Sequence, residues 1–465
     1  MVFVNSDPVI ENEDPFIVGF SEDILISTND GDYVHHVEPT LAIDSDGKIF
    51  AGWKNADGHN TRGVRVSFSR SDDNGKTWTT PYNMPMFEGI FTGQSDPWFV
   101  LYQDIIYYAY LEYSRAITSD LSQITVAKSD DYGYSWSTVS ATNGDDFADK
   151  ETMTIDSLGN IYVAYDDILT NGTVIVRITR SINEGESFQE RGIIADSRIH
   201  PIDHVGPYVT TNSENDVFVT WTWITTDYWG DIYITNSTDQ GATFETRLDI
   251  NPTSENGTFT VDLAGRPKEV TLPVIKFDSN DRLYILWSEL IDPDGSWGIF
   301  LRYSDDNGLT WSSRYTINQI VNGNQWQPDM DIDSQGRLHI SYYDQQGNSY
   351  GPYYRIAYFS SYSSTELIIT DAISIASDNT STVYTRPGDY FTIRVDSDDI
   401  PHVVWTDGRN EEMDIFYSHG ITAGLSSLQK GLAIGIPISV IVIGVSLSIV
   451  IITKERKYKN KRKSG

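Results

Sequence analysis

A pattern of strand, polar turn and strand recurs along most of the chain. In each copy, a run of mainly apolar residues leads into a short polar turn, and a second apolar run ends in an aromatic residue. Turns such as 44–47 (Asp-Ser-Asp-Gly) and 333–336 (Asp-Ser-Gln-Gly) carry the side chains that close hairpins. The copies lie at 41–53, 98–110, 155–165, 209–221, 275–287, 332–342 and 393–405. The pattern therefore predicts an all-β chain made of seven similar units.

The distance between copies indicates how many strands each unit contains. The turn residues Asp278 and Asp333 are 55 positions apart, and Asp333 and Asp396 are 63 positions apart. A third apolar run follows each hairpin, for example at 299–303, and most units continue into a fourth. A repeat of about 56–60 residues suits a four-stranded propeller blade. We therefore predict a seven-bladed β-propeller of four-stranded blades, with a six-bladed propeller as the alternative.

The two ends of the repeat array complement each other. The seventh unit stops after its third run, at 415–417, and so lacks a fourth strand. Segment 23–28 (Asp-Ile-Leu-Ile-Ser-Thr) precedes the first unit just as a fourth strand precedes each later unit. An unpaired edge strand invites aggregation, and closure of the ring removes it. We therefore predict that 23–28 pairs beside 414–418.

A second motif lies between the third and fourth runs of most units. It consists of Ser, Asp two positions on, Gly two further on, Ser or Thr, and an aromatic residue. Asp, Ser and Thr side chains hydrogen-bond nearby backbone N–H groups, and Gly accepts positive φ, so the motif closes a turn. A weaker copy has Asn183 in place of Asp, and the sixth unit has Ser-Ser-Tyr-Ser at 360–363 instead. The main positions are Ser71, Asp73, Gly75, Trp78, Ser129, Asp131, Gly133, Trp136, Asp239, Gly241, Phe244, Ser304, Asp306, Gly308 and Trp311.

The motif resembles the Asp-box of sialidase-like β-propellers, the BNR-repeat superfamily, over roughly residues 20–420. The resemblance implies a propeller that binds or hydrolyses glycans, with the Asp-box as a structural turn. A sialidase of this family would also carry an early Phe/Tyr-Arg-Ile-Pro motif, three arginines for the substrate carboxylate, an Asp acid/base and a Tyr nucleophile with its Glu. Here Tyr354-Arg355-Ile356 is followed by Ala357 and lies in the sixth unit. Whether the chain is an enzyme, and then a sialidase-like glycoside hydrolase, therefore stays open.

Candidate site residues lie in the loops that lead into the first strand of each unit. Propeller topology places these loops on one face, opposite the Asp-boxes. Converging carboxylates raise one another's pKa, which suits acid/base catalysis, or share a cation such as Ca²⁺. Alternatively, each acid caps its own turn. The candidates for catalysis are Asp149, Glu151, Asp203 and Glu269. The candidates for ligand binding are Glu38, Asp96, Asp329 and Asp389, with Arg266, Arg386 and Arg409 between them.

The loops between second and third strands add aromatic residues to the same face. Trp223 and Trp229 are the candidates for sugar contact, because aromatic rings stack on the apolar faces of sugars. The alternative is that these rings only pack their own loop.

Composition narrows the function classes. The chain contains no cysteine, which excludes disulfides and thiolate chemistry. Its formal net charge of −33 argues against nucleic acid as a partner, because nucleic-acid binding needs basic surface. No cofactor is required by any motif, no residue is a certain metal ligand, and Ca²⁺ is a possible ion for the acidic loops.

An apolar segment near the C-terminus predicts a membrane anchor. Residues 431–452 contain no charge and are followed by a basic tail. A helix of this length reaches about 33 Å, and the tail is expected on the cytoplasmic side, with the propeller outside. The N-terminus lacks the features of a signal peptide, so a tail-anchored cytoplasmic protein is the alternative. The expected organisation is a flexible segment 1–15, a propeller 16–422, a linker 423–430, a transmembrane helix 431–452 and a cytoplasmic tail 453–465.

Three functions are compatible with these features. The first is a single-pass cell-membrane propeller that binds glycans or another extracellular ligand, such as a surface protein. The second is a glycoside hydrolase of sialidase type that uses the carboxylates of the loops. The third is an adhesion or scaffold module without a small-molecule site.

Overall fold

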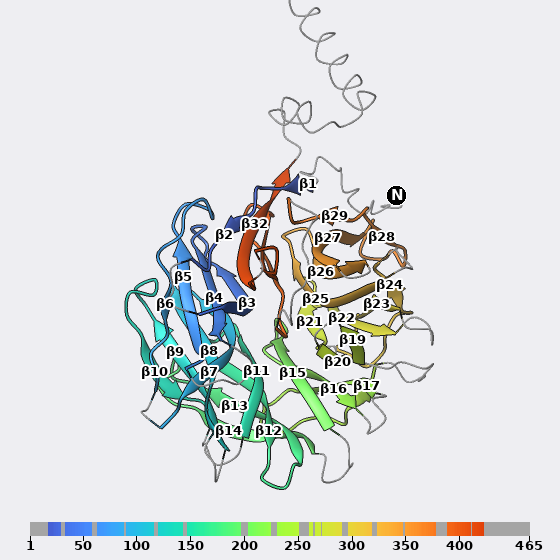
Figure 1. The fold of residues 1–465 in the computed structure, drawn as a ribbon. Helices are drawn as coiled ribbons and strands as arrows, with labels where there is room; N and C mark the ends of the chain where they lie inside the picture. Colours follow the sequence, from blue (N-terminus) through green and yellow to red (C-terminus); the bar gives the residue numbers. More distant parts are fainter. Residues whose placement is uncertain are drawn as a thin grey trace, which may run out of the picture.

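A ring of antiparallel sheets makes up the described part of the chain (Figure 1). The computed structural model describes residues 17–28, 33–57, 63–87, 90–115, 120–142, 147–196, 203–224, 230–250, 260–263, 266–270, 272–290, 296–318, 323–346, 349–377, 388–410 and 412–422. Seven sheets of four or five strands each form a blade, which confirms the seven-bladed propeller. An additional two-stranded hairpin stands apart from them.

The first six blades each use consecutive strands. Blades 1 to 3 are β3 (His35–Ile43), β4 (Ile49–Ala56), β5 (Arg65–Ser71) and β6 (Tyr82–Asn83); β7 (Gly93–Tyr102), β8 (Ile105–Arg115), β9 (Asp120–Ser129) and β10 (Ser137–Ser140); and β11 (Phe147–Ile155), β12 (Ile161–Ile168), β13 (Val174–Ser181) and β14 (Gln189–Asp196). Blades 4 to 6 are β15 (Asp203–Thr211), β16 (Val217–Ile224), β17 (Gly230–Ser237) and β18 (Leu248–Asp249); β21 (Val274–Phe277), β22 (Leu283–Leu290), β23 (Trp297–Ser304) and β24 (Tyr315–Thr316); and β25 (Asn324–Ile332), β26 (Leu338–Gln346), β27 (Ser349–Phe359), β28 (Leu367–Ile369) and β29 (Ile373–Ser374).

The last blade joins the two ends of the described chain. It contains β30 (Thr392–Val395), β31 (Pro401–Asp407) and β32 (Asp414–Thr422), with β1 (Ile17–Phe20) and β2 (Ile24–Leu25) paired against β32. Ile24 lies opposite Tyr417 and Leu25 opposite Phe416, so the predicted closure by 23–28 is confirmed. The strand β1 extends the same edge beyond the prediction (Figure 1).

The blades pack against one another through the aromatic residue that ends each copy of the sequence pattern, which lies inside the second strand. Trp53, Trp221, Trp287 and Trp405 are all fully buried. Burial of one such side chain contributes roughly 2–3 kcal/mol. The repeated aromatic position read from the sequence is therefore the position that holds neighbouring blades together.

The innermost strands share an irregularity near their starts. In five blades, two residues of the first strand lie opposite a single residue of the second strand, and the first of the two has positive φ. These pairs are Glu38-Pro39, Asp96-Pro97, Lys150-Glu151, Gly206-Pro207 and Gln327-Pro328. Such a bulge turns the side chains at the start of each inner strand toward the axis. We call the face where the inner strands begin the acidic face.

The opposite face carries the turns of the Ser-x-Asp-x-Gly motif, and we call it the turn face. In the first of these turns, the Gly75 N–H donates to Ser71 Oγ at 2.8 Å, and the Thr77 N–H donates to Asp73 Oδ1 at 2.8 Å. The same pattern recurs at 129–135, 237–243 and 304–310. In blade 6 the Ser364 N–H instead bonds to the Ser361 carbonyl, and β28 still follows. The sixth blade therefore forms its outer strand without the motif.

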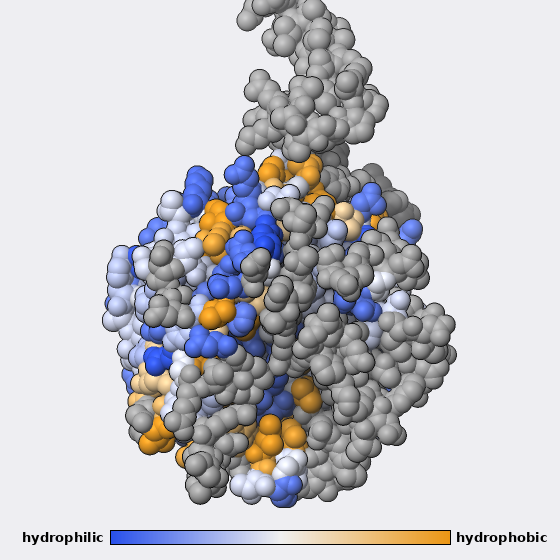
Figure 2. Space-filling model, viewed as in Figure 1, coloured by the Kyte–Doolittle hydropathy of each residue, from blue (hydrophilic) through white to orange (hydrophobic). Residues whose placement is uncertain are grey.

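Two parts of the organisation need separate mention. The hairpin of β19 (Thr260–Leu263) and β20 (Arg266–Val270) lies in the connection between blades 4 and 5, where the sequence predicted only a loop. No helix among the described strands and turns is long and apolar enough to cross a membrane. The predicted segments 1–15, 423–430, 431–452 and 453–465 lie outside the described residues. On the described part of the surface seen in Figure 2, hydrophilic and hydrophobic residues are interleaved.

Candidate functional site at the propeller axis

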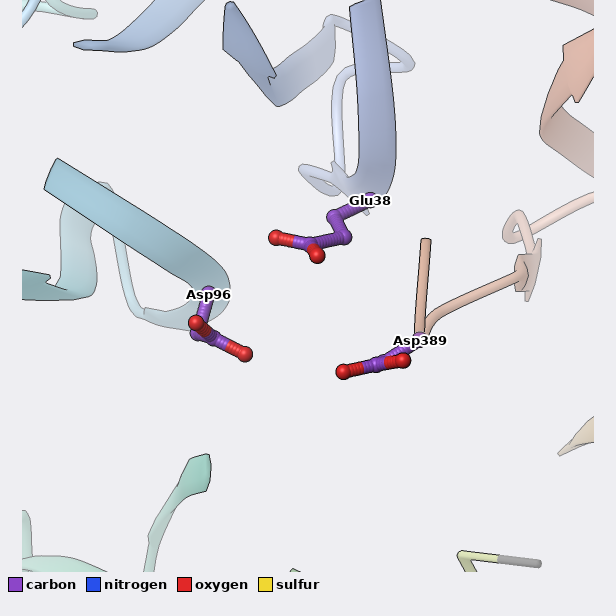
Figure 3. Close-up of side chains that lie close together, drawn as sticks. All are labelled: Glu38, Asp96 and Asp389. Atoms are coloured by element: carbon purple, nitrogen blue, oxygen red, sulfur yellow. The ribbon is translucent and has the colours of Figure 1, made fainter. Parts of the chain in front are cut away.

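Three buried acids from three blades meet at the acidic face. One carboxylate oxygen each of Glu38, Asp96 and Asp389 lies within 4.8 Å of the other two. Glu38 comes from β3, Asp96 from β7, and Asp389 from the segment just before β30. All three side chains point toward one another (Figure 3), and we call them the axial acid cluster. The structure thus brings together three of the predicted ligand-binding residues.

The backbone that holds these acids is strained. Glu38 and Asp96 have φ values of 58° and 53°, a region that residues with a Cβ seldom adopt. Asp389 follows Gly388, whose φ is 95°. A Cβ added to Gly388 would lie 2.7 Å from the backbone nitrogen of Glu38, so only glycine fits there. Strain of this kind persists where surrounding packing holds it, and it is common at functional sites.

Two lysines and two hydroxyl groups accompany the cluster. Lys150 Nζ lies 3.4 Å from Asp96 and also bonds Asp389. Lys54 Nζ lies 3.3 Å from Glu38. Ser95 Oγ donates to Glu38 at 3.2 Å, and Tyr390 Oη donates to Asp96 at 3.1 Å. Almost all of these partners come from a different blade or strand than the acid they contact, so the cluster joins elements far apart in the chain.

Two further predicted acids lie beside the cluster on β11. Burial, and then the nearby charge of Asp96, raises the pKa of Asp149 to about 6. Glu151 is completely buried, and its two carboxylate oxygens accept no side-chain or cross-strand hydrogen bond among the described residues. Burial, and then the charge of Asp96, raises the pKa of Glu151 well above its usual range. For Asp96, burial also acts to raise the pKa, but Lys150 and Lys54 outweigh it and hold that pKa below its usual range.

Acidic side chains gather around the cluster. Asp149 and Glu151 add two carboxyl groups to those of Glu38, Asp96 and Asp389, and Lys54 and Lys150 contribute ammonium groups that contact the three clustered acids. Isolated charges in a buried site are costly unless they are paired, protonated or bound to a cation. The arrangement therefore favours uptake of positive charge, either as protons or as a bound cation.

Aromatic rings separate the cluster from the central tunnel. Trp98 packs edge-on against Tyr208 at 5.3 Å and against Tyr390 at 6.1 Å between ring centroids. Next to these rings is a cavity of about 40 Å³, which Lys150 and Asp389 also line. On the far side, all seven innermost strands line a tunnel of about 420 Å³. The small cavity has room for only a few water molecules, whereas small-molecule ligand pockets measure about 300–1,000 Å³.

Two predicted binding residues have other partners. The carboxylate of Asp329 lies near the same cavity, but it accepts from Arg394 at 2.9 Å and from the Ile393 N–H at 3.0 Å. Arg409 donates to Asp407 at 2.6 Å and to Asp23 at 2.6 Å, so it ties the N-terminal segment to blade 7. Asp329 and Arg409 are thus engaged in ion pairs that hold the last blade in place.

Trp223 occupies an unusual position in its blade. It lies on β16, two residues after Trp221, and its indole packs edge-on against Tyr233 at 5.8 Å between ring centroids. In the other six blades this position holds an acid or an amide. Those residues are Asn55, Glu112, Asp167, Glu289, Asp344 and Asp407. A half-buried tryptophan in this ring of polar positions is a local departure from the repeat.

The remaining candidates cannot be placed as side chains. Arg386 and Trp229 lie outside the described residues, and Asp203, Arg266 and Glu269 are described only as parts of strands β15 and β20. The prediction of loops was wrong for most of the candidates. The innermost strands themselves contain Glu38, Asp96, Asp149, Glu151, Asp203 and Asp329. Arg266 and Glu269 lie in the hairpin of β19 and β20, where Glu269 pairs with Val261.

Sequence reasoning missed Lys54, Lys150 and Tyr390. A signal for Lys150 exists: it lies six residues before the turn residue Asp156, just as Glu38 lies six before Asp44 and Gln327 six before Asp333. That spacing identifies the bulge position, and Lys150 supplies the basic group there.

Comparisons with known proteins support the fold. Neither family models nor curated proteins match the chain. A solved polysaccharide lyase, an ulvan lyase, is similar to it with a TM-score of 0.55 and 11% identity, over 89% of this chain and 99% of that chain. The Hadza microbial sialidase Hz136 has a TM-score of 0.48 and 18% identity, over 66% of this chain and 63% of that one. An α-L-arabinanase from Penicillium chrysogenum has a TM-score of 0.44 and 13% identity, over 86% and 98%. At these identities the first likeness shows a shared fold, and the other two, below 0.5, carry no argument.

Proposed function

We propose that this chain is a glycan-binding propeller of the sialidase-like Asp-box type, displayed on the outside of a membrane by segment 431–452. In this proposal the glycan binds on the acidic face, and the tail 453–465 lies in the cytoplasm. The turns of the Ser-x-Asp-x-Gly motif support the Asp-box assignment through their repeated hydrogen bonds. The similarity in fold to a polysaccharide lyase supports a role with glycans.

One observation carries the proposal. Buried ionisable residues from blades 1, 2, 3 and 7 converge at one end of the axis, several of them at strained backbone positions. Burial of charge and backbone strain both reduce stability, and sites that combine them are commonly functional. Long connections, including the hairpin of β19 and β20, belong to the same face and can supply contacts to a ligand.

Binding fits the geometry better than hydrolysis. Glycoside hydrolases place two carboxyl groups about 5–5.5 Å or 6.5–9.5 Å apart, on either side of the scissile bond. In the axial acid cluster the nearest oxygens are within 4.8 Å, and Lys150 bridges two of the acids. The neighbouring cavity of about 40 Å³ is too small to hold a sugar ring beside these acids. Lys54 and Lys150 thus hold these acids and link their blades, and in this proposal the surrounding loops contact the sugar.

A glycan array probed with the full chain in detergent tests this function. We expect retention of a defined set of glycans and at least about tenfold weaker binding by Trp223→Ala, because ring stacking contributes to sugar affinity. Asp239→Asn, on the turn face, is the matched control and should bind like the wild type. Melting curves first confirm that each variant folds. No retained glycan on a broad array would refute the function, and unchanged binding by Trp223→Ala would refute the placement of the site.

Hydrolysis remains the second candidate because of two acids. Asp149, with a pKa of about 6, and Glu151, with a pKa well above its usual range, are protonated more readily than ordinary carboxyl groups, as a general acid requires. Release of reducing sugar from any glycan retained on the array, lost in Glu151→Gln, would support this candidate over simple binding.

Topology is tested separately. Protease added to intact cells should remove the propeller and spare an epitope in the tail, since the positive-inside rule places that tail in the cytoplasm. Survival of the propeller until the cells are lysed would support the cytoplasmic, tail-anchored alternative.

A further inference from the structure

We propose that Glu38, Asp96 and Asp389 bind one divalent cation at the propeller axis, for which Ca²⁺ has the best-matched chemistry, and that the ammonium group of Lys150 takes its place when the ion is absent.

The distances between the three acids suit a single ion. Ca²⁺ binds oxygen ligands at about 2.3–2.6 Å, so two ligands of one ion are separated by at most about 4.6–5.2 Å. The three carboxylate oxygens lie within 4.8 Å of one another and point toward a common centre (Figure 3). Carboxylates are the ligands that this ion prefers, and their number favours Ca²⁺ over softer metals.

A neighbouring acid points independently to a ligand. Glu151 is 0% exposed, and its oxygens receive nothing beyond its own backbone. Its strongest interaction with another residue is with the charge of Asp96. Four of the five bulges have a buried proline at this second position, at Pro39, Pro97, Pro207 and Pro328. The fold therefore fills this position with an apolar ring elsewhere, and in blade 3 it carries an unsatisfied carboxylate next to the cluster.

A structural acid in the same protein shows the contrast. Glu112, also 0% exposed, accepts hydrogen bonds from the Phe87 N–H at 2.9 Å and from the Thr125 hydroxyl at 2.7 Å. Gln94 and Gln123 complete its partners at 3.2 and 3.1 Å. A buried carboxylate that serves only packing thus receives a full set of donors. Glu151 receives none of this kind, and a cation bound by the neighbouring acids would offset the repulsion that it feels from the charge of Asp96.

Lys150 explains how the site persists without the ion. Its ammonium group bonds Asp389 and lies 3.4 Å from Asp96, inside the space that the ion would occupy. A lysine side chain is long and flexible and can withdraw toward the adjacent cavity, which Lys150 also lines. One ammonium group supplies a single positive charge, whereas a divalent ion supplies two, so the ion compensates the acids better.

The position of the site gives the ion a structural consequence. The three ligands come from blades 1, 2 and 7, and blades 7 and 1 are the pair that meets where the ring closes. Binding to the folded state alone stabilises it by mass action. The ion would therefore link blades 7 and 1 where the ring closes. This role is separate from any glycan contact on the same face.

The test is a calcium titration of the full chain in detergent, after removal of metal with a chelator. We expect binding of one Ca²⁺ per chain by calorimetry and a higher Tm in about 1 mM Ca²⁺. Asp96→Asn and Asp389→Asn should each weaken binding at least about tenfold. Lys150→Met should strengthen it by at least about tenfold, because the competing ammonium group is gone. Asp231→Asn, an acid of blade 4, is the matched control and should leave binding unchanged.

The outcomes distinguish a cation site from the alternative that Lys150 pairs with Asp96 and Asp389 at all times and no ion binds. No uptake by the wild type at about 10 mM Ca²⁺, or wild-type affinity in Asp389→Asn, would overturn the proposal. So would a Lys150→Met variant that melts lower both with and without Ca²⁺ and binds none. If Lys150→Met does not fold, Lys150→Gln takes its place, and the wild-type titration already decides whether the ion binds. This result does not depend on any glycan, so its failure leaves the glycan array to be judged alone.

Discussion

The two faces of the propeller place carboxylates beside left-handed backbone residues in different ways. On the turn face, Asp73 receives the Thr77 N–H at 2.8 Å and the Thr77 hydroxyl at 2.7 Å, all within one turn. The left-handed residue there, Asn74 with φ 58°, is exposed and is not itself the acid. On the acidic face, the left-handed residues Glu38 and Asp96 are themselves the acids, and both are buried.

Ionisation has opposite effects on stability for Asp73 on the turn face and for Asp149 beside the axial acid cluster. The hydroxyl and N–H groups of Thr77 hold the pKa of Asp73 below its usual range, so the ionised acid stabilises its turn. Burial and the charge of Asp96 raise the pKa of Asp149 to about 6, so the ionised acid costs stability. An acid such as Asp73, which is hydrogen-bonded within its own turn, stabilises the fold. An acid such as Asp149, whose surroundings disfavour its negative charge, can gain from binding a proton or a cation.

The largest expected loss of stability follows from substitution of Gly388. A Cβ there would lie 2.4 Å from Glu38 Cγ and 2.7 Å from Glu38 N, at φ 95°. Gly388→Ala should lower the free energy of unfolding by about 3–5 kcal/mol, combining the cost of positive φ with overpacking. Gly172→Ala, at φ 82° with nothing within 4 Å, isolates the first cost and should lose only about 1–2 kcal/mol. Urea unfolding measures both, and equal losses would show that the packing against Glu38 is not tight.

Mutation of an acid on the turn face should lower stability through the loss of hydrogen bonds within its own turn. Asp306 accepts from the Thr310 N–H at 2.8 Å and the Thr310 hydroxyl at 2.5 Å. Asp306→Ala should therefore cost about 2 kcal/mol. Asp306→Asn reproduces the natural blade 3 turn, in which Asn183 accepts from the Ser187 N–H at 3.1 Å, and should cost less. Equal losses in the two variants by thermal melting would mean that the charge, and not the acceptor geometry, stabilises the turn.

The pH dependence of stability should have opposite signs for Asp231 on the acidic face and Asp239 on the turn face. Burial, and then the negative charges of Asp249 and Glu289, raise the pKa of Asp231 to about 6. Its unfavourable contribution to the free energy of folding therefore grows as pH rises from about 4 through 6. Asp231→Asn should stabilise the protein by about 1 kcal/mol at pH 7.5, a value reduced for partial exposure, and have no effect near pH 4.

The turn-face acid for this comparison is Asp239. The hydroxyl and N–H groups of Thr243 lower its pKa to about 2, so its favourable contribution is present above about pH 4 and is lost as pH falls toward 2. Asp239→Asn should therefore destabilise the protein at neutral pH and have little effect near pH 2. Urea unfolding over this pH range measures both variants, and slopes of the same sign would contradict the comparison.

The smallest expected effect concerns contacts between neighbouring turns. The Ser213 hydroxyl bonds Asp281 of the next blade, and the Ser213 N–H also bonds it at 2.9 Å. Ser213→Ala keeps the N–H bond and loses an exposed hydroxyl bond, so the cost should be about 0.5 kcal/mol. A loss of several kcal/mol in thermal melting would show that the turn face depends on contacts between blades and not on local satisfaction.

Repetition explains which parts of the fold are predictable from the sequence. The hairpin turns recur seven times and the full Ser-x-Asp-x-Gly motif four times. Both are local patterns whose copies reinforce one another, so the blades and the closure by 23–28 could be predicted from the sequence. Within the described ranges the hairpin of β19 and β20 has no counterpart in another unit, and no period in the sequence indicates it. The sixth blade keeps β28 without the motif, because pairing with β27 suffices to place that strand.

The site was predictable only in part, for a related reason. Blade topology placed Glu38, Asp96 and Asp389 on one face, but their partners depend on contacts between blades. Lys150 bridges blades 3, 2 and 7, and no sequence spacing shows which acids it reaches. Arg409 forms an ion pair with Asp23, which lies 386 residues away in the sequence. Pairings over such distances follow from the closed ring and not from any local pattern.

The most direct test of the account is a crystal structure of the full chain grown with Ca²⁺ and measured for anomalous scattering. We expect an anomalous peak between Glu38, Asp96 and Asp389, about 2.3–2.6 Å from an oxygen of each, with the Lys150 ammonium group displaced toward its cavity. The turn-face acids, such as Asp73, should show no peak, because their own turns satisfy them. Lys150 still bonded to Asp389 at saturating Ca²⁺, with no peak between the three acids, would contradict the claim that the acidic face is left incomplete in order to bind.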